Sequence, residues 1–162
     1  MELNNKEKWF VEAGQVASNS KCLKAKCGSV IVDAEGNIIG QGYNGPAGNE
    51  ANRCNDKYIF PENNKYDVTC CVHAEVRAIH DAMIYHPNKI KGATLYFMRV
   101  DSNNMLTKAG APYCTLCSKE ALDSGLGYFG LWHEDGIKLY NTKEYNNISY
   151  QFFKDQNLWK LK

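Results

Sequence analysis

Hydrophobic residues recur along the chain with two different spacings, and each spacing predicts a different kind of element. Residues 4–19 carry apolar side chains at helical spacing, such as Trp9, Ala13 and Val16, which predicts an amphipathic helix with one buried stripe. Residues 28–33 and 37–43 each contain a short β-branched run, and the polar turn between them is typical of a hairpin. We therefore expect a helix followed by two antiparallel strands.

The middle of the chain changes from a loop-like to a helical pattern. Residues 45–69 are rich in Asn, Gly, Pro and charged residues without any sustained period, which predicts a long surface loop. From Val72 onwards apolar residues return at helical spacing, and Pro87 is expected to stop that helix.

The rest of the chain alternates between strand and helix patterns. Residues 93–100 are almost continuously apolar or aromatic, which predicts a buried strand. A helix should start after Pro112 and end near Gly125, with short strands at 127–132 and 137–140 and a last helix at 143–155. This order of elements predicts an α/β fold in which helices cover a mixed sheet, built as one domain over residues 1–162.

The composition favours a globular protein that acts on a small molecule. A chain of 162 residues with 44% hydrophobic residues is long enough to bury a core. The 19 Lys and Arg are balanced by 18 Asp and Glu, which argues against a long nucleic acid as partner. No apolar run approaches the ~20 residues that cross a membrane, and residues 1–10 do not resemble a secretion signal, so we expect a cytoplasmic protein.

The cysteines point to a metal site. Seven cysteines cannot all form pairs within one chain, so metal ligation explains them better than disulfides. His73 stands at one predicted helix start, and Cys114 and Cys117 stand at another. One imidazole and two thiolates are three ligands for a tetrahedral Zn²⁺, with the fourth position left for water. Glu75 would lie beside that water and could shuttle protons.

A Cys-x-x-Cys pair on its own is more often a structural zinc site or a redox pair than part of a catalytic zinc site. The carboxylate at Glu75 favours a catalytic zinc here, because a structural site has no need of an acid two residues after its histidine. His-x-Glu together with Pro-Cys-x-x-Cys is the known signature of the zinc nucleobase deaminases. In this chain Tyr113 stands between Pro112 and Cys114.

Five segments of the chain carry a family resemblance: SKC at 20–22, CGSVIV at 27–32, GYNGPAG at 42–48, HAEVRAI at 73–79 and PYCTLC at 112–117. Together they resemble the deoxycytidylate deaminases of the cytidine deaminase superfamily, over roughly residues 10–140. The resemblance implies a three-layer α/β/α fold with a mixed five-stranded sheet. It also implies zinc-dependent conversion of the nucleotide dCMP to dUMP with release of ammonia, by a chain that forms homo-oligomers.

The resemblance further implies two substrate contacts. Asn44 would hydrogen-bond the sugar 3′-hydroxyl, and the backbone around Ala74 would read the edge of the pyrimidine. From the residues alone, Asn44 is equally well explained as a turn residue. A deaminase of another base, of a nucleoside or of an RNA base is an alternative function, and so is a catalytically silent zinc-binding module of the same fold.

The sequence departs from the family pattern in the connection 101–111 and in Tyr113, which could reshape the substrate pocket. The remaining cysteines allow two interpretations. Some viral members of the resembled family are similar in having cysteines for a second, structural zinc at the positions of Cys22, Cys54 and Cys71, and Cys70 or a histidine could complete that site. Alternatively these cysteines are small buried hydrophobic residues.

Overall fold

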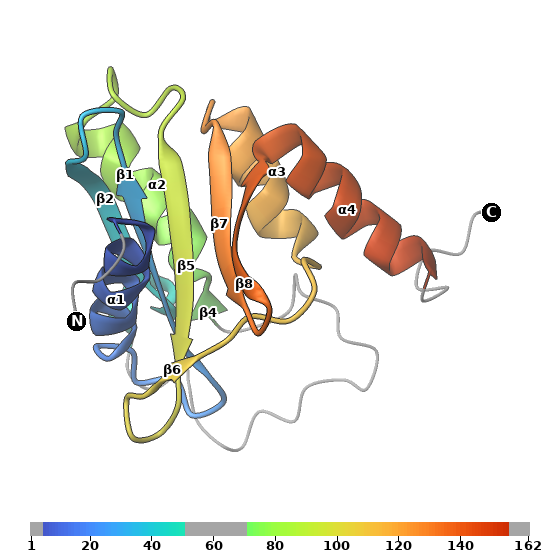
Figure 1. Ribbon diagram of the computed structural model, residues 1–162. Coiled ribbons are helices and arrows are strands. Elements are labelled where there is room, and N and C mark those ends of the chain that lie inside the picture. Colours follow the sequence, from blue (N-terminus) through green and yellow to red (C-terminus); the bar gives the residue numbers. More distant parts are fainter. Residues whose placement is uncertain (1–4, 51–70, 156–162) are drawn as a thin grey trace.

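The computed structural model describes residues 5–50 and 71–155 (Figure 1). A mixed sheet in the order β2-β1-β5-β7-β8 forms its centre. Strands β5 and β7 are parallel, and the other neighbouring pairs along this path are antiparallel. The strands are β1 (Lys26–Val32), β2 (Ile38–Tyr43), β5 (Thr94–Val100), β7 (Tyr128–His133) and β8 (Gly136–Asn141).

Helices cover both faces of this sheet, which confirms the three-layer fold (Figure 1). Helix α1 packs on one face, where Phe10 and Ala13 meet Met98 in a small core. The other three helices enclose the larger core on the opposite face. The helices are α1 (Asn5–Ala17), α2 (Ala74–Tyr85), α3 (Thr115–Asp123) and α4 (Thr142–Asp155).

Glycines allow α1 and α2 to approach the hairpin closely. A Cβ atom on Gly28 of β1 would collide with the backbone of Ala13 and Ala17 in α1. On β2, Gly40 and Gly42 face the backbone of α2 in the same way. Because α2 lies directly against β2, its first residues are held at a defined place beside the sheet.

Three pairs of residues form short strands that the sequence did not predict. In the connection after β5, β6 (Leu106–Thr107) pairs with the end of β5. At the ends of the predicted 45–69 loop, β3 (Gly45–Pro46) pairs with β4 (Cys71–Val72), and a 3-10 turn, η1, follows at Ala47–Asn49. A two-residue strand is too short to show any hydrophobic period, which is why the sequence pattern missed all three.

Arg77 of α2 holds the GYNGPAG turn in place. Its guanidinium donates hydrogen bonds to the carbonyl oxygens of Tyr43, Gly45 and Pro46, at 3.2, 3.3 and 2.7 Å, and to Asn49 Oδ1 at 3.0 Å. These four hydrogen bonds from the Arg77 guanidinium fix the turn against α2.

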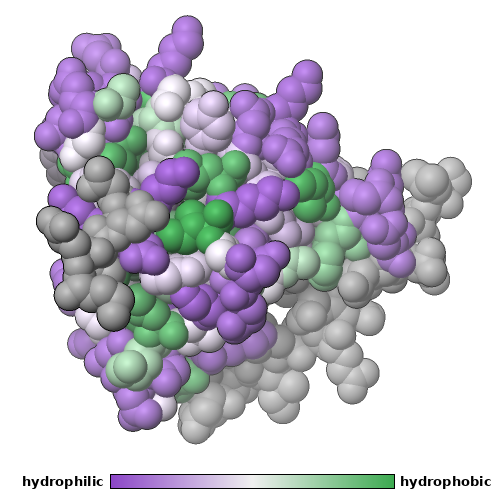
Figure 2. All heavy atoms as spheres, viewed as in Figure 1, coloured by the Kyte–Doolittle hydropathy of each residue, from purple (hydrophilic) through white to green (hydrophobic). Residues whose placement is uncertain are grey.

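The surface is mainly polar on the face that Figure 2 shows. Hydrophilic residues dominate there, and the hydrophobic residues form separate patches among them. Within the part of the chain that the structure describes, none of the helices is both long and apolar enough to cross a membrane.

Candidate functional site

Two helix N-termini bring the three predicted zinc ligands together. His73 is the N-cap residue of α2, and Cys114 is the N-cap residue of α3. The Cys114 sulfur accepts a hydrogen bond from the backbone N–H of Cys117, one turn into α3. Helix N-termini carry partial positive charge, which favours a thiolate at Cys114.

The three side chains form a cluster with the geometry of a metal site. His73 Nδ1 lies 3.1 Å from Cys117 Sγ and 3.4 Å from Cys114 Sγ, and the two sulfurs are 3.2 Å apart. A tetrahedral zinc ion holds two sulfurs about 3.8 Å apart and a nitrogen and a sulfur about 3.6 Å apart. The donor set therefore fits Zn²⁺ after an outward shift of a few tenths of an ångström. Among the residues that the structure describes, His73, Cys114 and Cys117 form the group that could hold a metal ion.

Glu75 lies in the first turn of α2, directly beside this cluster. Its side chain is buried, and burial raises the pKa of the carboxyl from 4.5 to about 7, with a further contribution from the neighbouring Cys114. A carboxyl group that titrates near neutral pH can both accept and donate a proton during one reaction cycle.

The pKa values of the cluster support its role as an anionic ligand set. Hydrogen bonds, first from Cys117 and then from His73, lower the pKa of the Cys114 thiol from 9.0 to about 5. The same contact with Cys114 raises the pKa of His73. Burial raises the pKa of Cys117, so this thiol needs a compensating positive charge to ionise. A bound metal ion would supply that charge.

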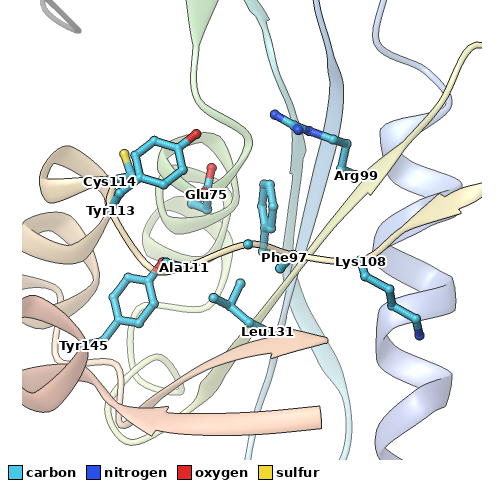
Figure 3. Close-up of a pocket in the computed structure, with 11 residues that line it drawn as sticks. Glu75, Phe97, Arg99, Lys108, Ala111, Tyr113, Cys114, Leu131 and Tyr145 are labelled. Atoms are coloured by element: carbon cyan, nitrogen blue, oxygen red, sulfur yellow. The ribbon is translucent and has the colours of Figure 1, made fainter. Parts of the chain in front are cut away.

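A cavity of about 100 Å³ opens beside Glu75 and Cys114 (Figure 3). Phe97 of β5, Leu131 of β7 and Tyr145 of α4 give it apolar walls. Its mixture of apolar walls with a few polar groups is typical of a small-molecule site. The pocket is thus built from five elements, α2, β5, the N-cap of α3, β7 and α4, that follow one another over much of the sequence.

Residues 106–113, which we term the strap, form a further wall of this pocket. The strap is anchored to the sheet at its first half: β6 pairs with β5, the Ala109 N–H donates to the carbonyl of Trp132 at 2.8 Å, and His133 Nδ1 lies 3.1 Å from the Ala109 oxygen. The Lys108 ammonium lies 3.1 Å from the centre of the Trp132 ring. The connection that departs from the family pattern is therefore an ordered part of the site.

The two predicted substrate contacts have different surroundings. The Asn44 side chain accepts a hydrogen bond from the backbone N–H of Cys27 and donates one to the carbonyl of Ala25, both at 2.8 Å. It therefore holds the start of β1 against the end of β2, as expected of a structural residue. Ala74 is fully buried at the start of α2 and does not line the cavity. Substrate binding by either residue stays a prediction.

Sequence reasoning missed the contribution of β5 to the pocket. Phe97 and Arg99 both line it, because they stand two positions apart on the same face of the strand. The signal that could have indicated them is the arginine itself, since it interrupts an otherwise apolar strand. Two aromatic residues of β7 do not line the pocket: Phe129 stacks on Tyr145 in the core, and Trp132 packs near Phe10 on the opposite face.

The predicted second metal site falls largely outside the described residues. Cys54 and Cys70 belong to residues 51–70 and have no structural description here. Cys71 is in β4 and Cys22 lies in the connection between α1 and β1. A second zinc at these four cysteines stays a prediction.

Comparisons with known proteins agree with this geometry. The family model for the cytidine and deoxycytidylate deaminase zinc-binding region matches residues 3–127. The crystal structure of the dCMP deaminase from cyanophage S-TIM5 is similar in fold, with 22% identity over 80% of this chain and 82% of that chain and a TM-score of 0.51. The same enzyme in complex with dCMP and dUMP shows 21% identity over 80% and 81% of the chains, also with a TM-score of 0.51.

A third similar structure is the cytidine deaminase from Burkholderia pseudomallei, with 14% identity over 86% of this chain and 94% of that chain and a TM-score of 0.56. Identities this low establish the shared fold alone. Among curated proteins none matches the sequence significantly. Since the family model spans most of the chain and includes His73, Glu75, Cys114 and Cys117, the chain belongs to the cytidine and deoxycytidylate deaminase family of zinc-dependent hydrolases.

Proposed function

We propose that this protein catalyses the hydrolytic deamination of a cytosine nucleotide, with dCMP as the preferred substrate and dUMP and ammonia as products. One observation carries the proposal: a His-Cys-Cys ligand set lies beside a buried carboxyl, Glu75, whose pKa is raised to about 7. A purely structural zinc site would have no need of that carboxyl.

The chemistry divides between the metal and the protein. His73, Cys114 and Cys117 would hold a zinc ion, which when bound makes a water molecule acidic enough to serve as nucleophile at neutral pH. Glu75 accepts the proton from this water and passes it to the ring nitrogen N3 of the cytosine as the water oxygen attacks C4. It then takes the second proton from that oxygen and delivers it to the 4-amino group, which leaves as ammonia while the C4–oxygen double bond forms, so that water and dCMP yield dUMP and ammonia in balance.

Several features support a cytosine nucleotide as the substrate. The GYNGPAG segment is the most informative part of the resemblance, because other deaminases share the zinc motifs, and a similar fold binds dCMP and dUMP in the cyanophage enzyme. Asn44 keeps one amide hydrogen and one oxygen lone pair beyond its two backbone bonds, which suffices for a sugar hydroxyl. The apolar side chains of Phe97 and Leu131 line the pocket and could hold a planar base.

The proton-shuttle role is tested with Glu75→Gln and the exposed Glu144→Gln as matched control. Glu75→Gln should lower kcat for dCMP by about 10²- to 10⁴-fold, because the amide cannot accept the proton. Zinc content should be unchanged, since Glu75 is not a ligand, and Glu144→Gln should behave as wild type. Retained activity of Glu75→Gln would contradict the assignment.

The substrate is tested by incubating the purified zinc-loaded protein with dCMP, CMP, deoxycytidine, and adenine and guanine nucleotides. We expect a dUMP peak from dCMP on chromatography, together with stoichiometric ammonia. No product from any of these compounds would reject an enzymatic role for the chain. Turnover of a purine compound alone would assign the protein to another branch of the superfamily.

A further inference from the structure

The pocket is lined by two basic residues, Arg99 and Lys108, that the proposed reaction does not use. They differ in where their charges lie (Figure 3). The Lys108 side chain points away from the pocket, and its ammonium is held over the Trp132 ring. The Arg99 side chain instead extends from β5 across Phe97, toward the side of the pocket where Glu75 lies. Arg99 is therefore the cation that the described residues present to the pocket.

The Arg99 charge has no carboxylate partner among residues 5–50 and 71–155. Its cross-strand neighbour is Cys27 of β1, and its guanidinium hydrogen-bonds the Cys27 thiol. A neutral thiol is a weak hydrogen-bond partner, so most of the five donors of the guanidinium stay available. An exposed arginine with an available planar fork is well suited to bind a phosphate through two parallel hydrogen bonds.

The position of Arg99 relative to the reacting end of the pocket fits the length of a nucleotide. Arg99 stands two residues beyond Phe97 on the same face of β5, so their Cα atoms lie about 7 Å apart. A base held at Phe97 and Glu75 would thus direct its sugar and the group attached to it toward Arg99. Asn44, whose side chain binds the Cys27 backbone, stands next to the same cross-strand pair. The predicted sugar contact and the arginine therefore both neighbour Cys27.

We propose that Arg99 binds the phosphate group of a nucleoside monophosphate and thereby makes this pocket prefer nucleotides to nucleosides. The inference rests on the deaminase function proposed above. It assigns the phosphate contact to a strand residue on β5. The strap closes the pocket beside Arg99, since β6 pairs with Arg99 and Val100. The connection that sets this chain apart from the family pattern thus supports the proposed phosphate site.

The test compares kcat/KM for dCMP and for deoxycytidine, which differ only in the phosphate. Arg99→Ala should lower kcat/KM for dCMP by about 10- to 150-fold, the loss expected for charged hydrogen bonds. The value for deoxycytidine should change less than about threefold, and Arg99→Lys should retain part of the preference, because lysine keeps the charge without the planar fork. Lys138→Ala serves as matched control, since Lys138 is an exposed cation on β8 that does not line the pocket.

Each outcome separates the phosphate proposal from the proposed reaction. If the wild type deaminates dCMP and deoxycytidine equally well, or if Arg99→Ala lowers both values by the same factor, Arg99 does not read the phosphate while the deaminase function stands. If the wild type turns over neither compound, the proposed function itself fails and the phosphate proposal fails with it. A thermal melt of each variant shows that its fold is intact, and added salt should weaken dCMP binding by the wild type but not by Arg99→Ala.

Discussion

Glu75 should make the stability of the metal-free protein fall as the pH rises. Its pKa is about 7 in the folded chain and near 4.5 in an exposed glutamate, so the unfolded chain loses this proton first. Between pH 4.5 and pH 7 the folded state binds more protons than the unfolded state, and the free energy of unfolding decreases with pH. Each pKa unit corresponds to about 1.4 kcal/mol, so the full interval amounts to about 3 kcal/mol.

Glu75→Gln removes this loss of stability at higher pH, because glutamine stays neutral at every pH. In protein stripped of metal with EDTA and kept reduced, the variant should gain about 3 kcal/mol over wild type between pH 4.5 and pH 7.5. This corresponds to a relative rise of about 6–12 °C in the thermal midpoint. The thiol of Cys114, whose pKa is lowered to about 5, titrates in both proteins and largely cancels in the comparison.

The assay is urea unfolding followed by circular dichroism at pH 4.5, 6.0 and 7.5, with Glu144→Gln as control. A difference between Glu75→Gln and wild type that does not change with pH would refute the reasoning, because it would show that the buried carboxylate meets no penalty for ionising. Added zinc should shrink the pH-dependent part, since the metal supplies a positive charge beside Glu75.

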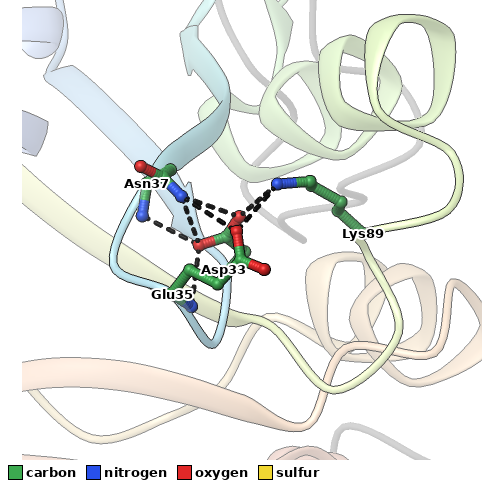
Figure 4. A network of polar contacts seen from close by, with 4 residues as sticks. All are labelled: Asp33, Glu35, Asn37 and Lys89. Carbon is green, nitrogen blue, oxygen red and sulfur yellow. Dashed lines mark hydrogen bonds and ion pairs between the residues drawn. The ribbon is translucent and has the colours of Figure 1, made fainter.

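Three further predictions test the metal site, the sheet and the hairpin. Cys117→Ser should lower the zinc content, measured by mass spectrometry, by one ion per chain, whereas Cys27→Ser should leave the zinc content unchanged. A zinc content of one ion per chain in the wild type would exclude the second zinc. Gly28→Ala should lower the free energy of unfolding in urea by about 1–3 kcal/mol, because its Cβ would collide with the backbone of α1. Gly110→Ala should cost less than this, because a Cβ there would meet open space. Asp33 accepts hydrogen bonds from Asn37 and pairs with Lys89, contacts that lower the pKa of its carboxyl to about 2 (Figure 4). Asp33→Asn should therefore lower the thermal midpoint at pH 7, and the difference from wild type should shrink as the pH falls from about 4 toward 2; an equal midpoint at pH 7 would refute this.

The sequence alone determined the candidate metal ligands and the order of the long helices and strands. The ligands were recognisable because His73, Cys114 and Cys117 stand at helix starts with a spacing that zinc chemistry requires, and spacing within one turn is a local property. The long helices and strands were recognisable because burial of one face leaves a regular hydrophobic period. From the sequence, Asn44 could be either a turn residue or a contact to the sugar. In the structure its side chain hydrogen-bonds the backbone, and the sugar contact stays a prediction.

Only the tertiary structure showed which residues line the pocket. Phe97, Arg99 and Leu131 come from two strands that are separated by a helix in the chain, and their common cavity follows from the parallel pairing of β5 with β7. The raised pKa of Glu75 depends on how much of the surrounding chain excludes water from it, which no local pattern encodes. The strap shows the same limit, because its position is set by single hydrogen bonds and two-residue strands that leave no period in the sequence.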